Sequence, residues 1–498
     1  MLFNSLPFIF LFLPVSFGVY FWLNHCRLVL AARAWLVAAS LFFYAWWNPL
    51  YLPLILLSIL VNFVIGNEIG RRRGRGGREG RGPGMHGLLM LGVIINLVVL
   101  GFFKYAHFFV DNLNMVFDAG FNLPQIVLPL AISFFTFQQI AYLVDCYREG
   151  PLEYDLLSYA IFVTFFPQLI AGPIVHHREM MPQFVTRANL FKRYRNIAAG
   201  LFLFSLGLFK KAVIADSFAV WVTPGFDGGL HLNFFEAWVT SLSYTFQLYF
   251  DFSGYTDMAL GAALLFNIRL PVNFDSPYKA CNIRDFWRRW HMTLSRFLRD
   301  YLYIPLGGSR HGALQTYASL FVTFVLGGLW HGASWMFVIW GALHGGAAVV
   351  HRLWSGLGLR IPDWLAWLLT FNFVNVAWVF FRAADLDAAM RILGGMAGLE
   401  GVVLPASLAG LLTPLGGLGM EFGVWMDPVH WPASSIAATA AALVGVLVLP
   451  NSNCLGRDVV WRTRMASPAW AGAFAVLFTF AVVKVAISVD IEFLYFNF

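Results

Sequence analysis

Two histidines in one stretch of the sequence are candidates for proton transfer. His291 ends a basic, tryptophan-rich run at residues 287–291 (WRRWH), and His331 lies inside an apolar run at residues 327–332 (GGLWHG). An imidazole in an apolar setting stays neutral and can accept a proton from a hydroxyl at physiological pH. His331 is therefore a candidate general base, and a histidine that only packs is the alternative.

The segment around His291 has helical periodicity over residues 283–302. Trp287, His291, Leu294 and Leu298 recur at spacings of four, three and four, which places them on one face of a helix with the arginines away from it. A helix of this pattern lies in the membrane interface with its apolar face down, so His291 points inward. From the spacing alone His291 is a packing residue or part of a tunnel mouth, and packing is favoured.

The segment around His331, residues 314–335, is predicted to lie in the membrane. Its glycines weaken a helix but allow another group to approach the backbone closely. The spacing of Gly328 and Gly332 is typical of helix packing, while glycines beside a membrane histidine also suit the approach of a substrate. His344 and His351, on the next apolar segment, are assigned to structure.

The composition predicts a polytopic membrane protein. Hydrophobic residues make up 59% and charged residues 12% of the 498 residues, whereas about a quarter of the residues are charged in a soluble domain. About a dozen apolar runs are long enough to cross a hydrocarbon core. The first, residues 6–23, lacks the flanks of a removable signal peptide and is interpreted as a retained span. We predict an all-α integral membrane protein with one domain over residues 1–498.

Basic residues predict the orientation of the chain. Residues 67–86 form a loop of glycine and arginine, which the positive-inside rule places in the cytoplasm, and the N-terminus is then extracytoplasmic. We interpret this loop as a topology determinant, not a nucleic-acid site. Residues 267–312 are also basic and are predicted to be a cytoplasmic region with the interfacial helix. The cysteines show no metal-ligand spacing: Cys26, Cys146, Cys281 and Cys454.

An apolar stretch at residues 155–172 is flanked by basic residues on both sides, including His176 and His177. Residues 166–173 (FPQLIAGP) would break a helix twice, and irregular backbone at membrane depth is tolerated where protein buries it or it lines a cavity. We predict a re-entrant element that contributes to a pocket. An ordinary span with a proline kink is the alternative.

Two acids interrupt another apolar run. Asp251 and Asp257 are functional hypotheses by their position, and pairing with a nearby arginine is the favoured alternative. Residues 385–431 are rich in Gly, Pro and Leu without clear periodicity. The tail, residues 490–498, is aromatic and is expected to pack at the interface.

Several motifs, taken in order, resemble the membrane-bound O-acyltransferase (MBOAT) family and, within it, the bacterial branch of polysaccharide O-acetylation typified by the alginate system. They lie at residues 43–47 (FYAWW), 132–138 (ISFFTFQ), 166–173 (FPQLIAGP), 251–255 (DFSGY), 273–278 (NFDSPY), 285–291 (DFWRRWH), 305–308 (PLGG), 329–332 (LWHG) and the aromatic C-terminus. The Gly/Arg loop and roughly residues 385–431, a variable insertion, fall outside the resemblance.

This resemblance implies a fold and a chemistry. The fold would have about a dozen transmembrane or re-entrant helices around a central funnel that reaches a buried histidine from each side. His331 matches the family's near-universal histidine. His291 matches a second position, which is His in this branch and Asn in many other members. The family passes an acyl group from a cytosolic thioester or a carrier to an extracytoplasmic hydroxyl.

The expected catalytic residues are His331 and His291. His331 would act as general base, a contribution of about a hundredfold to ten-thousandfold, and a transient acyl-His331 is the alternative. His291 would position the donor or stabilise the developing oxyanion. No metal is expected. The expected donor is acetyl-CoA, with its phosphates held by guanidinium groups, though topology anchoring explains these arginines equally well. The donor-site residues are Arg288, Arg289, Arg296, Trp287 and Trp330.

The expected setting is the bacterial inner membrane, with the bilayer and a periplasmic O-acetyltransferase or acceptor protein as partners. A polysaccharide such as alginate would be acetylated indirectly, and no nucleic acid is expected. One alternative is D-alanyl transfer to teichoic acid from an acylated carrier protein. The other is a transporter or flippase for lipid-linked sugars, against which the lack of an internal repeat with paired broken helices weighs.

Overall fold

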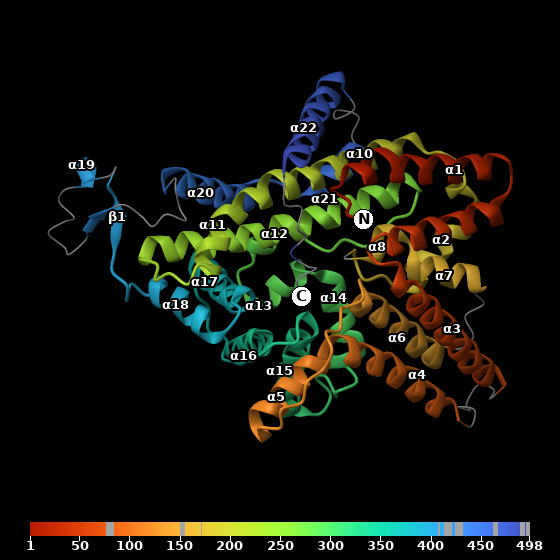
Figure 1. Cartoon of the computed structure of the whole chain (residues 1–498), viewed down its shortest axis with the longest axis horizontal. Coiled ribbons are helices and arrows are strands. Elements are labelled where there is room, and N and C mark those ends of the chain that lie inside the picture. The colour runs from red at the N-terminus through yellow and green to blue at the C-terminus, as the bar shows by residue number, and fades with distance from the viewer. Residues whose placement is uncertain are drawn as a thin grey trace. The chain divides into compact units, whose positions relative to one another are not determined.

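The computed structural model describes residues 1–75, 84–149, 155–170, 172–406, 409–412, 421–423, 432–461, 467–488 and 494. The regular secondary structure of these residues is helical apart from one pair of three-residue strands, which confirms the all-α prediction (Figure 1). The tip of the Gly/Arg loop, Ala171, much of residues 405–431 and nearly all of the aromatic tail lie outside the described residues. The chain divides into two compact units.

The first unit comprises Met1–Leu208, Tyr255–Val272 and Gly456–Phe496. An aromatic cluster lies in its core, with Phe3, Phe8, Phe12, Phe43 and Phe166 at ring-centroid separations of 4.9 to 6.0 Å. Its helices are α1 (Leu13–His25), α2 (Val29–Ala45), α3 (Leu52–Arg75), α4 (Met85–Leu100), α5 (Ala106–Phe117), α6 (Ile132–Glu149), α7 (Leu156–Thr164), α8 (Phe166–Leu169), α9 (His177–Val185), α10 (Tyr194–Phe209, of which Phe209 is in the second unit) and α22 (Pro468–Ile487), with π-helical turns Phe8–Phe12 and Gly101–Tyr105 and 3-10 turns Pro49–Tyr51 and Arg187–Asn189.

The second unit comprises Phe209–Gly254, Asn273–Leu455 and Asn497–Phe498. Helix α12 (Phe234–Leu265) contributes to both units, as does α21 (Ser452–Trp461). The unit's other elements are α11 (Asp216–Asp227), α13 (Ile283–Arg289), α14 (Met292–Leu298), α15 (Gly312–His331), α16 (Trp335–Gly356), α17 (Asp363–Arg382), α18 (Leu386–Met396), β1 (Val403–Pro405), α19 (Ala409–Leu412), β2 (Glu421–Gly423) and α20 (Pro432–Val448), with π-helical turns Lys210–Ala215 and Arg299–Tyr303 and the 3-10 turn Pro277–Lys279. Helix α16 packs against α15, α13 and α17.

Eight helical segments of the described chain are long and apolar enough to cross a membrane. They are Phe8–His25, Pro49–Arg73, Met85–Phe117, Tyr194–Asp227, Gly312–His331, Trp335–Gly356, Asp363–Arg382 and Pro468–Ile487. Two shorter apolar helices, Val29–Ala45 and Ser434–Val448, accompany them. The protein is therefore a multi-pass membrane protein.

The helix predicted to break around residues 166–173 is broken. Helix α7 ends at Thr164, because Phe165 leaves the helical region at φ −48° and ψ 110°, and α8 ends after one turn. Nine residues of α-helix extend only about 14 Å, which is too short to cross a hydrocarbon core. The backbone N–H of Phe166, freed by the break, donates to Oγ of Ser40 at 3.1 Å. A buried side chain thus satisfies the irregular backbone, as the sequence argument required.

The region at residues 385–431 is more regular than expected. The sequence shows no clear periodicity there, yet residues 386–396 form α18, capped by Asp385, whose side chain accepts from the backbone N–H of Ala388 at 2.8 Å. Strands β1 and β2 then pair in parallel, with Val403 opposite Glu421. The cap residue was the available signal for this helix.

Candidate functional site

His331 is the last residue of α15 and is enclosed by aromatic rings. Its side chain is buried, with its ring centroid 4.9 Å from Trp330, 5.1 Å from Trp340 and 5.2 Å from Phe381, each at a steep angle. Trp340 comes from α16 and Phe381 from α17. Side chains from three helices therefore enclose the imidazole in aromatic rings.

The glycines near His331 bring α15 and α16 together. A Cβ added to Gly328 would lie 2.2 Å from the carbonyl oxygen of Phe337, and one added to Gly341 would lie 2.5 Å from that of Phe324. At Gly332 the ring of Phe337 would be 2.0 Å away. The close neighbour of Gly328 and Gly332 is thus helix α16, and that of Gly341 is helix α15, which matches the packing interpretation of the spacing.

His291 lies at a break between two short helices, and the predicted continuous helix over residues 283–302 is wrong. Helix α13 ends at Arg289 and α14 begins at Met292, while His291 has a left-handed backbone with φ 42°. The prediction that this side chain points inward is confirmed, because His291 is fully buried. Its burial comes from the turn, which periodicity does not register.

The turn is held by Asn273, a residue to which sequence reasoning gave no role. Its Oδ1 accepts the backbone N–H of Thr293 at 3.2 Å and the hydroxyl of Thr293 at 2.9 Å, and lies 3.1 Å from Nδ1 of His291. Its backbone carbonyl accepts the N–H of Met292 at 3.0 Å. One side chain and its own backbone thus satisfy the polar groups freed where the helix breaks.

These contacts fix the position of the proton on His291. A backbone N–H only donates, so the atom of Asn273 that receives it is the amide oxygen, and an oxygen without hydrogen cannot donate in return. Nδ1 of His291 therefore carries the hydrogen, and Nε2 carries the lone pair of the neutral ring. Burial lowers the pKa of His291 to about 3, so the ring is neutral at physiological pH.

Trp330 contacts both candidate histidines. Its ring centroid is 6.3 Å from that of His291 and 4.9 Å from that of His331. The ring of Phe252, from α12, packs edge-on against His291 at 4.8 Å. The structure therefore brings His291, Trp330 and His331 into one aromatic cluster of the second unit.

The other predicted site residues lie in different surroundings. Trp287 is buried, and its indole N–H donates to Nδ1 of His344 at 3.2 Å. Its ring centroid is 5.8 Å from that of Trp340, which in turn is 5.1 Å from that of His331. His344 is fully buried.

The three arginines differ in exposure and in their bonds. Arg288 is exposed, and Arg296 is half-buried. Arg289 pairs with Asp285, with its Nε 3.0 Å from Oδ2, and donates to the carbonyl of Asp275 at 3.3 Å. Arg288 is therefore the most accessible of the three to a phosphate outside the protein.

Asp251 takes part in a buried ion pair, next in sequence to the Phe252 that packs on His291. Nζ of Lys211 lies 2.7 Å from Asp251 and 2.6 Å from Asp216, and Lys211 and Asp251 are almost inaccessible to solvent. The expectation that Asp251 pairs with a basic residue is confirmed, although the partner is a lysine where an arginine was expected. Paired charges of this kind fix neighbouring segments in an apolar interior.

Known proteins align with most of this chain. Residues 147–384 match the model of the membrane-bound O-acyltransferase family, a range that includes both histidines and the broken helix. The peptidoglycan O-acetyltransferase of Helicobacter pylori is 52% identical over 436 residues, which cover 81% of this chain and 81% of that protein. A probable alginate O-acetylase of Pseudomonas aeruginosa is 42% identical over 402 residues, 80% of this chain and 75% of that protein.

A more distant relative covers less of the chain. The teichoic acid D-alanyltransferase of Streptococcus thermophilus is 28% identical over 283 residues, which cover 51% of this chain and 68% of that protein. The extent of the two stronger alignments, together with the family match across both histidines, identifies the chain as a member of the membrane-bound O-acyltransferase family and thus as an O-acyltransferase.

Proposed function

We propose that this enzyme transfers an acetyl group from a cytosolic thioester, acetyl-CoA, for the O-acetylation of a polysaccharide of the bacterial cell envelope. The observation that carries the proposal is the contact of Trp330 with both His291 and His331, which groups two buried imidazoles in one aromatic cluster. Two O-acetylating relatives align with four-fifths of the chain. Membership in an acyltransferase family leaves the transporter alternative without support.

In the proposed reaction His331 is the general base. It takes the proton of the acceptor hydroxyl while the hydroxyl oxygen bonds to the acetyl carbonyl carbon, and the carbonyl oxygen becomes an oxyanion. When the oxyanion collapses, the carbon–sulfur bond breaks, and the imidazolium returns its proton to the departing thiolate. The products are an acetyl ester and free coenzyme A, so no oxidant or metal is consumed.

His291 acts as a hydrogen-bond acceptor in this scheme. Its Nδ1–H donates a hydrogen bond to Oδ1 of Asn273, so Nε2 carries a lone pair that can accept a hydrogen bond. A lone pair repels an oxyanion, which argues against the oxyanion-stabilising role and favours positioning. Suitable groups are the acceptor hydroxyl or an amide N–H of the pantetheine arm of the donor. Arg288 is the candidate for the phosphates of coenzyme A, since guanidinium matches phosphate geometry.

Among envelope polysaccharides we favour peptidoglycan over alginate as the polymer that is finally acetylated. The relative named for peptidoglycan is 52% identical and the relative named for alginate 42%, over similar shares of the chain. The direct acceptor in this proposal is a periplasmic acetyltransferase, which carries the group onward. The protein would lie in the inner membrane with its N-terminus outside, because the arginine-rich loop and residues 267–312 favour the cytoplasm.

The test is acetyl transfer by the purified full-length protein in liposomes. Wild-type protein should release free coenzyme A from radiolabelled acetyl-CoA and label an acceptor supplied on the far side. His331→Gln should reduce both activities by about a hundredfold to ten-thousandfold, while its melting temperature stays near that of wild type. Protein that is inert with acetyl-CoA but active with a D-alanyl carrier protein would refute the acetyl proposal in favour of the D-alanyl alternative. Variants as active as wild type would refute the role of His331.

A further inference from the structure

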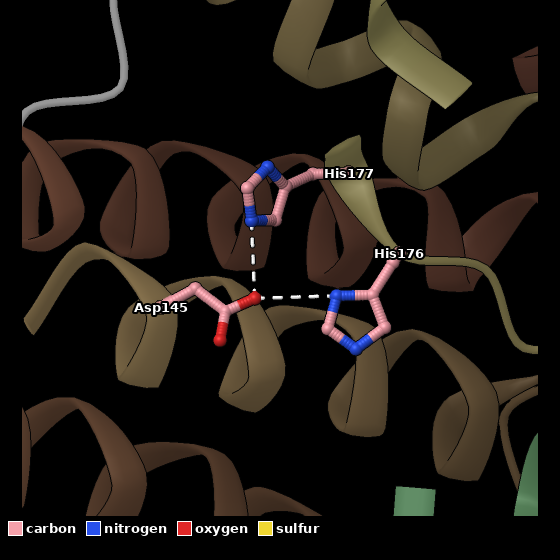
Figure 2. A group of neighbouring side chains, drawn as sticks. All are labelled: Asp145, His176 and His177. Atoms are coloured by element: carbon pink, nitrogen blue, oxygen red, sulfur yellow. Dashed lines mark hydrogen bonds and ion pairs between the residues drawn. The ribbon is translucent and has the colours of Figure 1, made fainter. Parts of the chain in front are cut away.

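A cluster of metal-ligating side chains lies in the first unit, apart from the residues of the proposed reaction. Oδ2 of Asp145, near the end of α6, lies 3.1 Å from Nε2 of His177 and 3.3 Å from Nδ1 of His176 (Figure 2). One potential ligand atom from each residue lies within 4.8 Å of the other two. Figure 2 shows both imidazoles turned toward the same carboxylate oxygen.

These separations match those of a tetrahedral zinc site. With zinc–nitrogen and zinc–oxygen bonds of about 2.0–2.1 Å, neighbouring ligand atoms lie about 3.3 Å apart. The two carboxylate–imidazole separations already have this length. The imidazoles need only to approach each other, and His176 lies in extended backbone just before α9, with φ −89° and ψ 138°, where its ring can turn.

The chemistry of the cluster also suits a zinc ion. Carboxylate oxygen and imidazole nitrogen are both zinc ligands, and only 6% of the Asp145 side chain is exposed. The neighbouring Glu149 forms an ion pair with Arg178 instead.

The site combines a rigid side with an open side. His177 is 1% exposed, and its ring meets the rings of Tyr142 and Phe162 at right angles, which fixes the direction of its Nε2. His176 is 24% exposed and gives an ion access from solvent. A solvent ligand on that side would complete four-coordination.

We propose that Asp145, His176 and His177 bind one Zn²⁺ ion, which fastens the beginning of α9 to the end of α6. The segment between α7 and α9 contains the broken helix, so the ion would hold the chain where that irregular stretch ends. The site lies in the first unit, whereas His291 and His331 belong to the second. Its role is structural, and its test does not depend on acetyl transfer.

The experiment uses full-length protein without a polyhistidine tag, stripped with a chelator in detergent and titrated with Co²⁺. Wild-type protein should bind one Co²⁺ per chain with the visible absorption of a four-coordinate site, and Zn²⁺ should displace it. Asp145→Asn and His176→Gln should lose this saturable absorption. His231→Gln is the matched control, because His231 pairs with a carboxylate, Glu400, at 3.0 Å on an exposed surface.

A second readout is the melting temperature. Zn²⁺ should raise it in wild type and in His231→Gln and leave it unchanged in His176→Gln, since a ligand stabilises the folded state only where that state binds it. Because His176 is only half-buried, the His176→Gln protein should fold as wild type does. Wild-type protein that binds no Co²⁺, or His176→Gln protein that binds it as wild type does, would overturn the proposal. In the first case the contact between Asp145 and the two histidines consists of hydrogen bonds alone.

Discussion

His291 donates its Nδ1 hydrogen to Oδ1 of Asn273 at 3.1 Å, and the same oxygen accepts the N–H and the hydroxyl of Thr293. One amide oxygen therefore sets both the turn between α13 and α14 and the tautomer of the imidazole. Rigid support of this kind keeps a functional nitrogen in place without help from the substrate.

The first prediction concerns His291. His291→Asn should fold as wild type does, because asparagine tolerates left-handed backbone and its amide can donate to Asn273. Its amide oxygen is an acceptor but lies closer to the backbone than Nε2 does, so the hydrogen bond accepted at Nε2 is lost and acetyl transfer should fall by about 5- to 150-fold, the equivalent of one lost hydrogen bond of about 1–3 kcal/mol. Liposome kinetics measure the fall.

His291→Ala is the comparison for this prediction. Alanine at φ 42° costs about 1–2 kcal/mol and donates nothing to Asn273, so its melting temperature should drop where that of His291→Asn does not. Full activity in a folded His291→Asn protein would exclude the acceptor role.

The second prediction concerns His331. His331→Gln removes the base but keeps a polar side chain in the aromatic box, and should reduce acetyl transfer by about a hundredfold to ten-thousandfold. His351→Gln, on α16 and half-buried, should match wild type. An acyl group recovered on His331 after rapid quenching would support the acyl-histidine route over the general-base route.

The third prediction is a pH dependence of stability. The pKa of His291 falls from 6.5 to about 3 on burial, so between these pH values the unfolded chain binds a proton that the folded protein does not. Stability is then complete above pH 6.5 and is lost as the pH falls, by about 1.4 kcal/mol per pH unit. His291→Asn should lack this component. Unfolding in urea at pH 6.5, 5.5 and 4.5 compares the two proteins, and equal slopes would contradict the assignment.

The fourth prediction concerns the contact between α15 and α16. Gly328→Ala places a Cβ 2.2 Å from the carbonyl oxygen of Phe337 and must separate the helices, so both the melting temperature and acetyl transfer should fall. Gly346→Ala is the matched control on α16, since a Cβ there meets nothing within 4 Å. It should raise stability by about 0.5–1 kcal/mol through the better helix propensity of alanine. Similar melting temperatures for the two variants would refute the packing role.

Local signals in the sequence predicted much of the fold. Long apolar runs identified membrane spans, and Pro167 and Gly172 marked the broken helix, because these residue types restrict or free the backbone wherever they occur. The helix α18 escaped notice, since its cap at Asp385 lies in a stretch dominated by Gly and Leu.

The environment of the histidines depends on long-range contacts that no window of sequence displays. Periodicity correctly predicted that the side chain of His291 points inward, but it predicted a continuous helix where the structure has a turn. A periodic pattern cannot reveal a left-handed turn held by Asn273, 18 residues away. The partnership of Trp287 with His344 likewise joins residues 57 positions apart. His176 and His177 were interpreted as part of a basic flank, and only the fold brings Asp145 to them.

The left-handed turn at residue 291 also bears on how such enzymes diversify. Histidine and asparagine are among the few residues, other than glycine, that populate this backbone readily, and their codons differ by a single nucleotide. A lineage can therefore exchange an imidazole for an amide here in one mutational step, with Asn273 still receiving a hydrogen bond. The scaffold lets evolution alter the chemistry of the position while the backbone stays unchanged.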